Sequence, residues 1–291
     1  MAKLELKNVS YSYSPGTPFE KKALQNISLS IDAGSITGII GHTGSGKSTL
    51  VRMFNGLLAP ESGEVLLDGV DINADKKALA SVMCRVGLVM QYPEYQLFDE
   101  TVEKDISFGP RNMKLSDEEI AERVREAARF TGIPDEMLER SPFDLSGGQK
   151  RRVAIAGVLA MRPEVIVLDE PAAGLDPMGR KEILGGLVNY RDRTGAAIVI
   201  VSHNMEDMAN YCDKIIVLKE SREAFSGTPE EVFSRRAELE ENGLDVPDTV
   251  KLADELRARG IPISGEICTP DALAAELSSI LGYSGRREAK C

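Results

Sequence analysis

The chain has 291 residues and a formal net charge of −11, with 42% hydrophobic and 28% charged residues. This balance is ordinary for a soluble globular protein, and it excludes both disorder over most of the chain and a mini-protein that needs disulfide or metal staples. The acidic charge argues against nucleic acid or an anionic membrane surface as a direct partner, and the four cysteines form no Cys-x-x-Cys pair of the kind that holds structural zinc.

The first third of the chain predicts a small sheet followed by a strand, a glycine-rich loop and a helix. Its start alternates charged and apolar residues and lacks the apolar core of a signal peptide. Apolar alternation over residues 4–13 and 24–31 predicts two antiparallel strands joined by a loop at 14–18. A short apolar run at 35–40 then leads through the loop into a helical pattern at 48–57. A phosphate-binding loop requires this order of elements.

The chain between residues 64 and 218 alternates between strand and helix patterns. Strands are predicted at 64–67, 86–90, 165–168, 197–201 and 215–218, and helices at 116–130, 149–161, 178–191 and 204–211. Such alternation is typical of α/β proteins, in which a mostly parallel sheet carries helices on both faces. Every apolar run is shorter than the ~20 residues of a membrane helix, so we expect no membrane span.

From about Thr228 the sequence changes to short helical patterns interrupted by glycine and proline, which predicts an appended tail. Apolar residues of this tail that share helical faces are Val250, Leu252, Ala253, Leu256, Leu273, Leu277, Ile280 and Leu281. These faces bury apolar area either against the tail's own cassette or against a second chain. In the second case the contact would hold two chains together independently of nucleotide.

Residues 41–48 match the pattern G-x-x-x-x-G-K-[ST]. The loop residues are Gly41, His42, Thr43, Gly44, Ser45, Gly46, Lys47 and Ser48, and Thr49 follows them. Glycines let backbone N–H groups converge on phosphates, and the dipole of the following helix adds to the attraction. Lys47 would neutralise phosphate charge and Ser48 would hold Mg²⁺ through its hydroxyl. His42 occupies an unconstrained position of the loop.

The apolar run at 165–168 ends in the carboxylates Asp169 and Glu170. The carboxyl edge of a parallel sheet is where ligands of open α/β folds bind. Asp169 suits Mg²⁺, which prefers hard oxygen ligands, and Glu170 is placed to polarise a water that attacks a phosphate. A strand that ends in Asp-Glu is weak support by itself, because helix caps and solvated charges give the same pattern. Its combination with the phosphate loop makes the prediction strong.

The run Leu145-Ser146-Gly147-Gly148-Gln149 is the most diagnostic segment, since its chance occurrence is on the order of 10⁻⁴ for this composition. It resembles the signature of ATP-binding-cassette (ABC) ATPases. The same residues are a serine N-cap and a Gly-Gly turn before the helix at 149–161, and such a helix start is a good anion site. The resemblance implies ATP and Mg²⁺ as cofactors, and a signature that meets the γ-phosphate held by a second ATPase subunit.

Further positions match other motifs of the ABC family. The resemblance implies that Gln91 contacts Mg²⁺ and the attacking water, that His203 contacts the γ-phosphate, and that Asp176 belongs to a loop that crosses the dimer interface. It also implies that Tyr13 stacks on adenine, although Tyr11 competes for this role. A lone histidine at a strand end would otherwise count as structural. The interval between Lys47 and Leu145 is too short for the coiled coil of chromosome-maintenance ATPases.

The resemblance also implies the architecture of the chain. The fold class is α/β, with a P-loop NTPase core built on a mostly parallel sheet and a small antiparallel β subdomain. The nucleotide-binding core would comprise residues 1–92 and 163–228, and an inserted helical signature subdomain would comprise 93–162. Residues 229–291 would form the C-terminal helical tail, a candidate dimerisation domain.

Residues 91–98, 100–110 and 169–179 are similar to the energy-coupling-factor (ECF) type of importer ATPase. The implied protein is an ATPase that powers uptake of a vitamin or of cobalt or nickel ions. It would lie at the cytoplasmic face of the membrane, pair with a copy of itself or a paralogue, dock under a transmembrane coupling protein and work with a separate membrane substrate-binding protein. Tyr95, Leu97 and Phe98 would form an apolar groove wall for the coupling protein, whereas the alternative for this segment is an ordinary loop with buried aromatics.

Two other functions share most of these residues. The nucleotide-binding subunit of another ABC importer or exporter would keep every catalytic position but lack the segment at 91–98. A soluble ABC ATPase that acts on ribosomes or DNA is disfavoured, because such members usually carry two cassettes per chain and nucleic acid favours basic surfaces.

Overall fold

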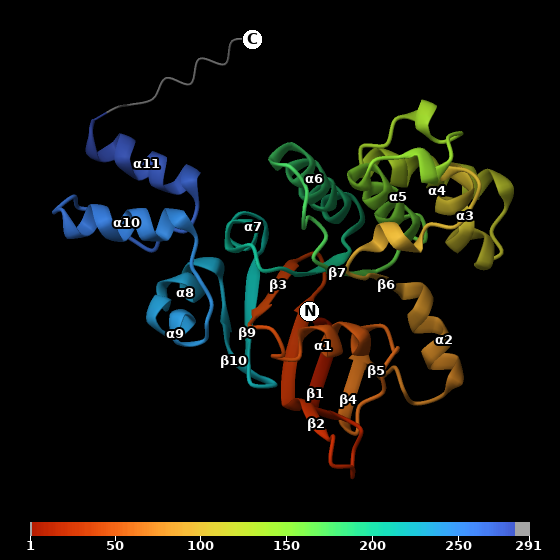
Figure 1. The fold of residues 1–291 in the computed structure, drawn as a ribbon, viewed down its shortest axis with the longest axis horizontal. Helices are drawn as coiled ribbons and strands as arrows, with labels where there is room; N and C mark the ends of the chain where they lie inside the picture. The colour runs from red at the N-terminus through yellow and green to blue at the C-terminus, as the bar shows by residue number, and fades with distance from the viewer. Residues whose placement is uncertain (1, 283–291) are drawn as a thin grey trace.

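The computed structural model describes residues 2–282 and is built around a six-stranded sheet (Figure 1). The strand order is β10-β9-β3-β8-β7-β6. These strands are β3 (Ile36–Gly41), β6 (Val86–Val89), β7 (Val165–Asp169), β8 (Ala197–Val201), β9 (Lys214–Lys219) and β10 (Arg222–Gly227). All neighbours pair in parallel except β9 and β10, which form an antiparallel hairpin. The expected α/β class with a mostly parallel sheet is confirmed.

A second, antiparallel sheet contains the beginning of the chain. Its order is β2-β1-β4-β5, with β1 (Ala2–Tyr13), β2 (Lys21–Asp32), β4 (Ser62–Leu67) and β5 (Val70–Asp71). In β1 and β2 the inward positions Leu4, Leu6, Ile27 and Ile31 are almost fully buried. The alternation that predicted this sheet therefore reflects one face packed on the core.

The two faces of the six-stranded sheet enter different parts of the core. In β7, Val165 and Val167 pack with the antiparallel sheet and helix α1 (Lys47–Phe54), whereas Ile166 and Leu168 pack with the helices of the opposite face. All four side chains are fully buried. A strand covered on both sides has a continuous apolar sequence without polar alternation, which is why 165–168 is uniformly apolar.

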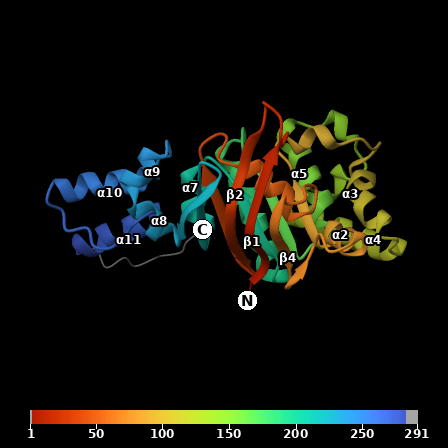
Figure 2. The same cartoon turned by 90° about the horizontal axis from the view of Figure 1, so that it is seen from below.

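The remaining helices group around these sheets (Figures 1 and 2). They are α2 (Lys76–Arg85), α3 (Val102–Asn112), α4 (Asp117–Phe130), α5 (Gly147–Leu159), α6 (Pro177–Thr194) and α7 (Met205–Tyr211), with 3₁₀ turns η1 (Pro93–Gln96), η2 (Asp135–Met137) and η3 (Pro142–Asp144). Helices α3, α4 and α5 form a group within the segment predicted as the helical subdomain. This group and the C-terminal tail lie on opposite sides of the molecule.

The tail consists of α8 (Pro229–Ser234), α9 (Arg236–Glu241), α10 (Asp248–Ala258) and α11 (Pro270–Ile280). Its first part belongs to the main core, because Val232, Phe233 and Leu239 are buried in the same cluster as α7. Val250 at the start of α10 also packs in the main core, whereas Ala253, Ile263 and Leu273 form a small separate cluster of α10, the following segment and α11. The core thus continues past the expected boundary at residue 228, and the last residues of the expected tail, 283–291, lie outside the described part of the chain.

Several local features differ from the sequence prediction. Helix α1 ends at Phe54 and not at Leu57, because Gly56 adopts a left-handed φ of +77° just after the C-cap Asn55. Elements α2, α3, β5 and β10 were not predicted. The charge and glycine content of these segments hide their periodicity: β10, for example, alternates exposed and half-buried residues on the sheet edge.

Candidate functional site

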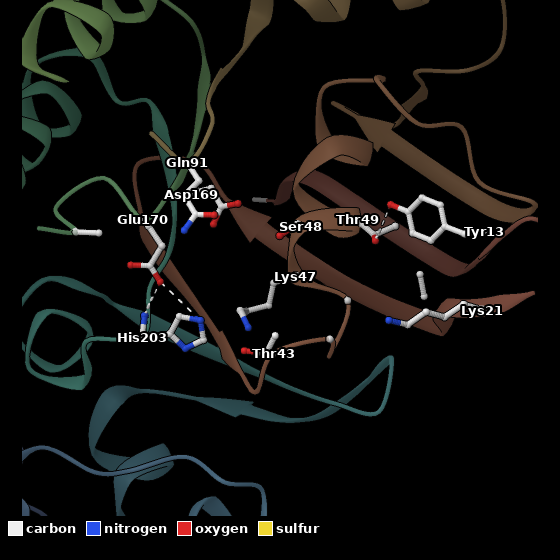
Figure 3. Close-up of a pocket in the computed structure, with 14 residues that line it drawn as sticks. Tyr13, Lys21, Thr43, Lys47, Ser48, Thr49, Gln91, Asp169, Glu170 and His203 are labelled. Atoms are coloured by element: carbon white, nitrogen blue, oxygen red, sulfur yellow. Dashed lines mark hydrogen bonds and ion pairs between the residues drawn. The ribbon is translucent and has the colours of Figure 1, made fainter. Parts of the chain in front are cut away.

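A cleft of about 440 Å³ opens at the carboxyl edge of the six-stranded sheet (Figure 3). Its lining residues are Tyr13, Lys21, Ala23, Thr43, Gly44, Gly46, Lys47, Ser48, Thr49, Gln91, Asp169, Glu170, Ala173 and His203. They come from the ends of several strands and from the loop between β3 and α1. The cleft thus gathers residues that are more than 150 positions apart in the sequence, as expected for the edge of a parallel sheet.

The loop before α1 has a backbone that glycine permits. Gly46 is the N-cap of α1 with φ +106°, and a Cβ at this position would lie 2.5 Å from the carbonyl oxygen of Ala23. Within residues 2–282, no side chain caps this helix terminus, and the buried Ser45 Oγ has no hydrogen-bond partner. Free N–H groups at a helix start, next to an open cleft, form an anion site.

The Lys47 side chain lies along the loop in the middle of the cleft. Its Nζ donates hydrogen bonds to the carbonyl oxygens of Gly41 at 2.5 Å and His42 at 3.0 Å. Burial lowers the pKa of Lys47, and the nearby carboxylates of Asp169 and Glu170 oppose this shift. A buried ammonium group that bonds only neutral carbonyls and faces acidic groups across a cleft is suited to an anionic ligand.

Glu170 connects the end of β7 with the end of β8. Its Oε1 accepts the backbone N–H of His203 at 2.9 Å and its Oε2 accepts the Ser202 hydroxyl at 3.3 Å. The His203 Nε2 lies 3.8 Å from Oε1. Glu170 itself adopts a left-handed φ of +53°, which is strained for a side chain with a Cβ. Such strain persists only where the surroundings impose it, so the position of this carboxylate is tightly defined.

Burial raises the pKa of both carboxyls at the end of β7. For Asp169 the opposing effects come from Lys47 and His203, and for Glu170 chiefly from His203. A raised pKa makes a carboxylate a better proton acceptor. The two carboxyls differ in their neighbours, since Asp169 faces Lys47 and Glu170 is held by the loop after β8. This difference suits them to different tasks.

Tyr13 lies at the end of the cleft opposite Glu170 and His203, with Lys47 between them (Figure 3). The Tyr13 hydroxyl is hydrogen bonded to Thr49 Oγ1 at 3.1 Å. Tyr11 packs edge-on against the Tyr13 ring, with centroids 5.1 Å apart, and belongs to the core beneath. Of the two tyrosines, the structure brings Tyr13 to the cleft.

The comparisons with known proteins agree with this geometry. Residues 24–173, just over half of the chain, match the family model described as ABC transporter. A protein of Symbiobacterium thermophilum called energy-coupling factor transporter ATP-binding protein EcfA2 is 54% identical over 281 residues, covering 97% of this chain and 96% of that protein. The EcfA2 of Caldanaerobacter subterraneus subsp. tengcongensis is 53% identical over 266 residues, covering 91% and 93%. The chain belongs to the ECF transporter ATP-binding proteins.

Two solved structures resemble this ECF ATP-binding protein. CbiO1 from Clostridium perfringens, described as part of the ABC transporter complex CbiONQ, has a TM-score of 0.75 and 40% identity, covering 89% of this chain and 95% of that chain. The ATP-binding cassette MJ0796, solved as a dimer bound to ADP and Pi, has a TM-score of 0.70 and 30% identity, covering 78% and 98%. The expected P-loop NTPase fold is therefore confirmed, and the ECF protein is an ATP-binding ABC ATPase.

The cleft of this ECF protein fits the ligands that the family implies. The N–H groups at the start of α1 and the Lys47 ammonium suit the phosphates of ATP. Oxygen donors of Ser48, Gln91 and Asp169 line the same cleft, and hard oxygen ligands are what Mg²⁺ requires. Of the residues 41–49, Gly41, His42 and Ser45 do not line the cleft, whereas the others do.

The signature residues of the ECF protein lie at the start of α5, apart from the residues that line the cleft. Ser146 and Gln149 form a capping box, in which the Ser146 hydroxyl accepts the Gln149 N–H at 3.3 Å and the Gln149 side chain accepts the Ser146 N–H at 2.9 Å. Ser146 and Gly147 are exposed, and Gly148 packs near Leu175. Asp176 caps α6 through a bond from Gly179 N–H at 2.9 Å and is also exposed.

The segment after Gln91 corrects one expectation. Tyr95 is 85% exposed and Phe98 is 57% exposed, but Leu97 is only 9% exposed and packs in the main core. Leu97 therefore cannot form part of a groove wall, since it is the residue that anchors this segment to the body. The alternative of an ordinary loop with buried aromatics is also wrong, because the aromatic rings point outward.

Three cleft residues were not predicted from the sequence. Lys21 and Ala23 follow the loop of the antiparallel sheet, and Ala173 follows Glu170. In β2, Lys21 is exposed and Ala23 is buried, as in any strand with one buried face. Only the packing of β2 against the loop at 41–48 brings both residues to the cleft. None of the helices between residues 2 and 282 is long and apolar enough to cross a membrane.

Proposed function

We propose that the chain hydrolyses ATP to drive an ECF importer that takes up a vitamin or cobalt or nickel ions. One observation carries this proposal: a single cleft brings Lys47, Asp169 and Glu170 together in a chain whose EcfA2 relatives match it over more than 90% of its length. A regulator that has lost catalysis would not need this set of groups. The printed description of CbiO1 as part of CbiONQ supports a place in a membrane transport complex.

In this proposal each cleft residue has one task. Lys47 and the N–H groups of the loop bind the phosphates, and Tyr13 stacks on the adenine at the other end of the cleft. Ser48, Gln91 and Asp169 hold Mg²⁺, which when bound neutralises charge on the terminal phosphates. Glu170 accepts a proton from the attacking water. His203 lies beside Glu170 at the end of the cleft that receives the γ-phosphate. The His203 backbone N–H holds the Glu170 carboxylate in place.

The proposal includes a second ATPase subunit, either a copy of this chain or a paralogue. Ser146, Gly147, Gly148 and Gln149 start a helix whose capping box uses the N–H groups of Ser146 and Gln149 but not those of Gly147 and Gly148, which suits a phosphate held by another chain. Asp176 is exposed on the loop before α6, where it would contact the same partner. The dimeric state of MJ0796, a relative with a TM-score of 0.70, supports this arrangement.

The proposal also includes a transmembrane coupling protein and a separate membrane substrate-binding protein, with the ATPase as a peripheral subunit at the cytoplasmic face. Four exposed aromatic side chains form what we call the aromatic patch: Tyr92, Tyr95, Phe98 and Phe108. The rings of Phe98 and Phe108 pack edge-on with centroids 4.9 Å apart. Exposed aromatic residues of this kind suit an apolar helix of a membrane partner.

The function is tested with the complex that copurifies with the tagged chain from a membrane extract. The complex, reconstituted in vesicles, should hydrolyse ATP only with Mg²⁺ and should take up a labelled vitamin or cobalt or nickel in an ATP-dependent manner. Copurification with no membrane protein, or hydrolysis without Mg²⁺, would contradict the proposal.

The docking surface is tested separately with the double variant Tyr95→Ser and Phe98→Ser. It should lose most copurification with the membrane partner while binding ATP with unchanged affinity, because both side chains lie outside the cleft. Phe19→Ser is the matched control, since Phe19 is 84% exposed but lies on the loop between β1 and β2. Normal assembly of the double variant, or equal loss in the control, would refute this surface.

A further inference from the structure

A buried arginine joins three segments that surround the nucleotide cleft. Arg151, in the second turn of α5, is 4% exposed. Its Nε and Nη2 donate to the two carboxylate oxygens of Glu94 at 3.1 and 2.9 Å, and its Nη1 donates to the carbonyl oxygen of Ala173. The Glu94 side chain is only 16% exposed. This is a two-point ion pair with a third bond to the main chain, so the guanidinium has a fixed position.

Each of the three segments carries a group of the proposed ATPase site. Helix α5 begins directly after its N-cap Ser146, the signature residue that lies five positions before Arg151. Glu94 belongs to η1, the turn that follows the cleft residue Gln91. Ala173 itself lines the cleft, and its N–H donates to the carbonyl oxygen of Glu170 at 3.3 Å. One side chain thus connects the signature helix with the segments that hold Gln91 and Glu170.

The two segments bound by Arg151 have little freedom near the cleft. Tyr92, between Gln91 and Glu94, has a left-handed φ of +58°, and Glu170 has a φ of +53°. A displacement of Glu94 or of the Ala173 carbonyl is therefore transmitted to the neighbouring cleft residue instead of being absorbed by free rotation of the backbone. The aromatic patch begins at Tyr92 and Tyr95, which flank Glu94 in the chain.

We propose that Arg151 is the positioning residue that aligns the signature helix with the Gln91 and Glu170 segments. The aromatic patch, these two cleft segments and the signature at the start of α5 then move together. The proposal rests on the proposed ATPase function and adds a residue to it. Arg151 lies in the core and does not line the cleft, so it acts on the reaction only through Glu94 and Ala173. A lysine at this position keeps the charge but cannot bond both Glu94 oxygens and the Ala173 carbonyl at fixed angles.

The test measures ATP hydrolysis by the assembled transporter complex for Arg151→Lys, Arg151→Gln, Glu94→Gln and the double variant Arg151→Gln with Glu94→Gln. Misplacement of a catalytic segment lowers turnover more than binding, so we expect kcat to fall about ten-fold in Arg151→Gln and Glu94→Gln, with KM for ATP changed less than about two-fold. Arg151→Lys should recover part of the rate. The double variant should lose no more than the worse single variant, because both changes break the same ion pair between Arg151 and Glu94.

Arg123→Lys is the matched control. Arg123 also pairs with a carboxylate, Glu119, and donates to a main-chain carbonyl, that of Met161, at 3.1 Å. Its side chain is 12% exposed, and its hydrogen bonds go to Glu119 and to Met161, just beyond the C-terminal end of α5, and not to Glu94 or Ala173. The midpoint temperature of thermal unfolding is measured for each variant alongside the kinetics. Arg123→Lys should lower this temperature as much as the Arg151 and Glu94 variants do, but it should leave kcat unchanged.

The outcomes separate this inference from the proposed function. If the wild-type complex hydrolyses ATP and the Arg151 and Glu94 variants keep their kcat, or if Arg123→Lys loses kcat to the same extent as they do at an equal loss of thermal midpoint, the positioning role is wrong and the ATPase function stands. Additive losses in the double variant would also overturn it. If the wild-type complex shows no hydrolysis, the proposed function itself fails.

Discussion

Replacing Glu170 by Gln separates catalysis from folding at the proposed site. The carboxylate accepts the His203 N–H at 2.9 Å and the Ser202 hydroxyl at 3.3 Å. A glutamine keeps the size, keeps one acceptor oxygen for His203, and places an NH₂ beside the Ser202 oxygen, which can accept. The free energy of unfolding should therefore change by less than about 1 kcal/mol. The proton acceptor is lost, however, and a general base contributes about 10²- to 10⁴-fold in rate.

In the assembled complex, Glu170→Gln should thus lower kcat by at least about 100-fold, which corresponds to about 3 kcal/mol in the barrier, while ATP affinity stays within about two-fold. The assay is steady-state phosphate release, with ATP affinity measured by titration. Glu164→Gln is the control, because Glu164 precedes the other end of β7 and pairs with Lys3 and Arg85 away from the cleft. A kcat above one tenth of the wild-type value would refute the base assignment.

Three further predictions follow from buried groups. Lys47→Ala should raise the Kd for ATP about ten-fold or more in a titration, because it removes the buried cation that faces the phosphates; unchanged affinity would count against the site. Burial raises the pKa of Asp207 to about 6, with Arg180 opposing, so the folded chain holds this proton more tightly than the unfolded chain and loses stability as pH rises from about 4 to about 6. In urea unfolding, the free energy of unfolding of Asp207→Asn should accordingly rise by up to about 3 kcal/mol relative to that of the wild type between pH 4 and pH 7. A difference between the two proteins that does not change with pH would contradict this. In urea unfolding, Leu97→Ser should lower the free energy of unfolding by about 3 kcal/mol, whereas Phe98→Ser should lower it by less than about 1 kcal/mol. Equal losses would show that the two side chains are not buried to different extents.

The sequence was most informative where one physical constraint determines the residue. The loop at 41–48 needs glycine at a left-handed position that leaves no room for a Cβ, as Gly46 shows, so its pattern predicts both the backbone and the ligand. The uniformly apolar strand β7 reflects burial on both faces, and its acidic end follows from the sheet edge. In these places local sequence and tertiary structure impose the same requirement.

Prediction failed where tertiary contacts decide the role of a residue. Leu97 and Phe98 are adjacent apolar residues, and no local pattern shows that one enters the core while the other faces outward, since η1 and α3 set that orientation. Lys21 and Ala23 reach the cleft only because β2 packs against the loop before α1. Arg151 resembles the neighbouring arginine in sequence, and only the structure shows that its partners come from residues 94 and 173.

The tail illustrates how such contacts change a functional argument. Phe233 and Val250 pack in the main core, so the segment from α8 to the start of α10 is part of the cassette and not a separate contact device. Leu273 is buried against α10, which satisfies much of the apolar face that suggested a second chain. What is left for a partner within residues 229–282 is the outer side of α10 and the end of α11, where Leu252 is 48%, Ile280 37% and Leu281 70% exposed. A nucleotide-independent contact through the tail would therefore have to form on this smaller surface, and removal of the whole tail would damage the cassette before it tested that contact.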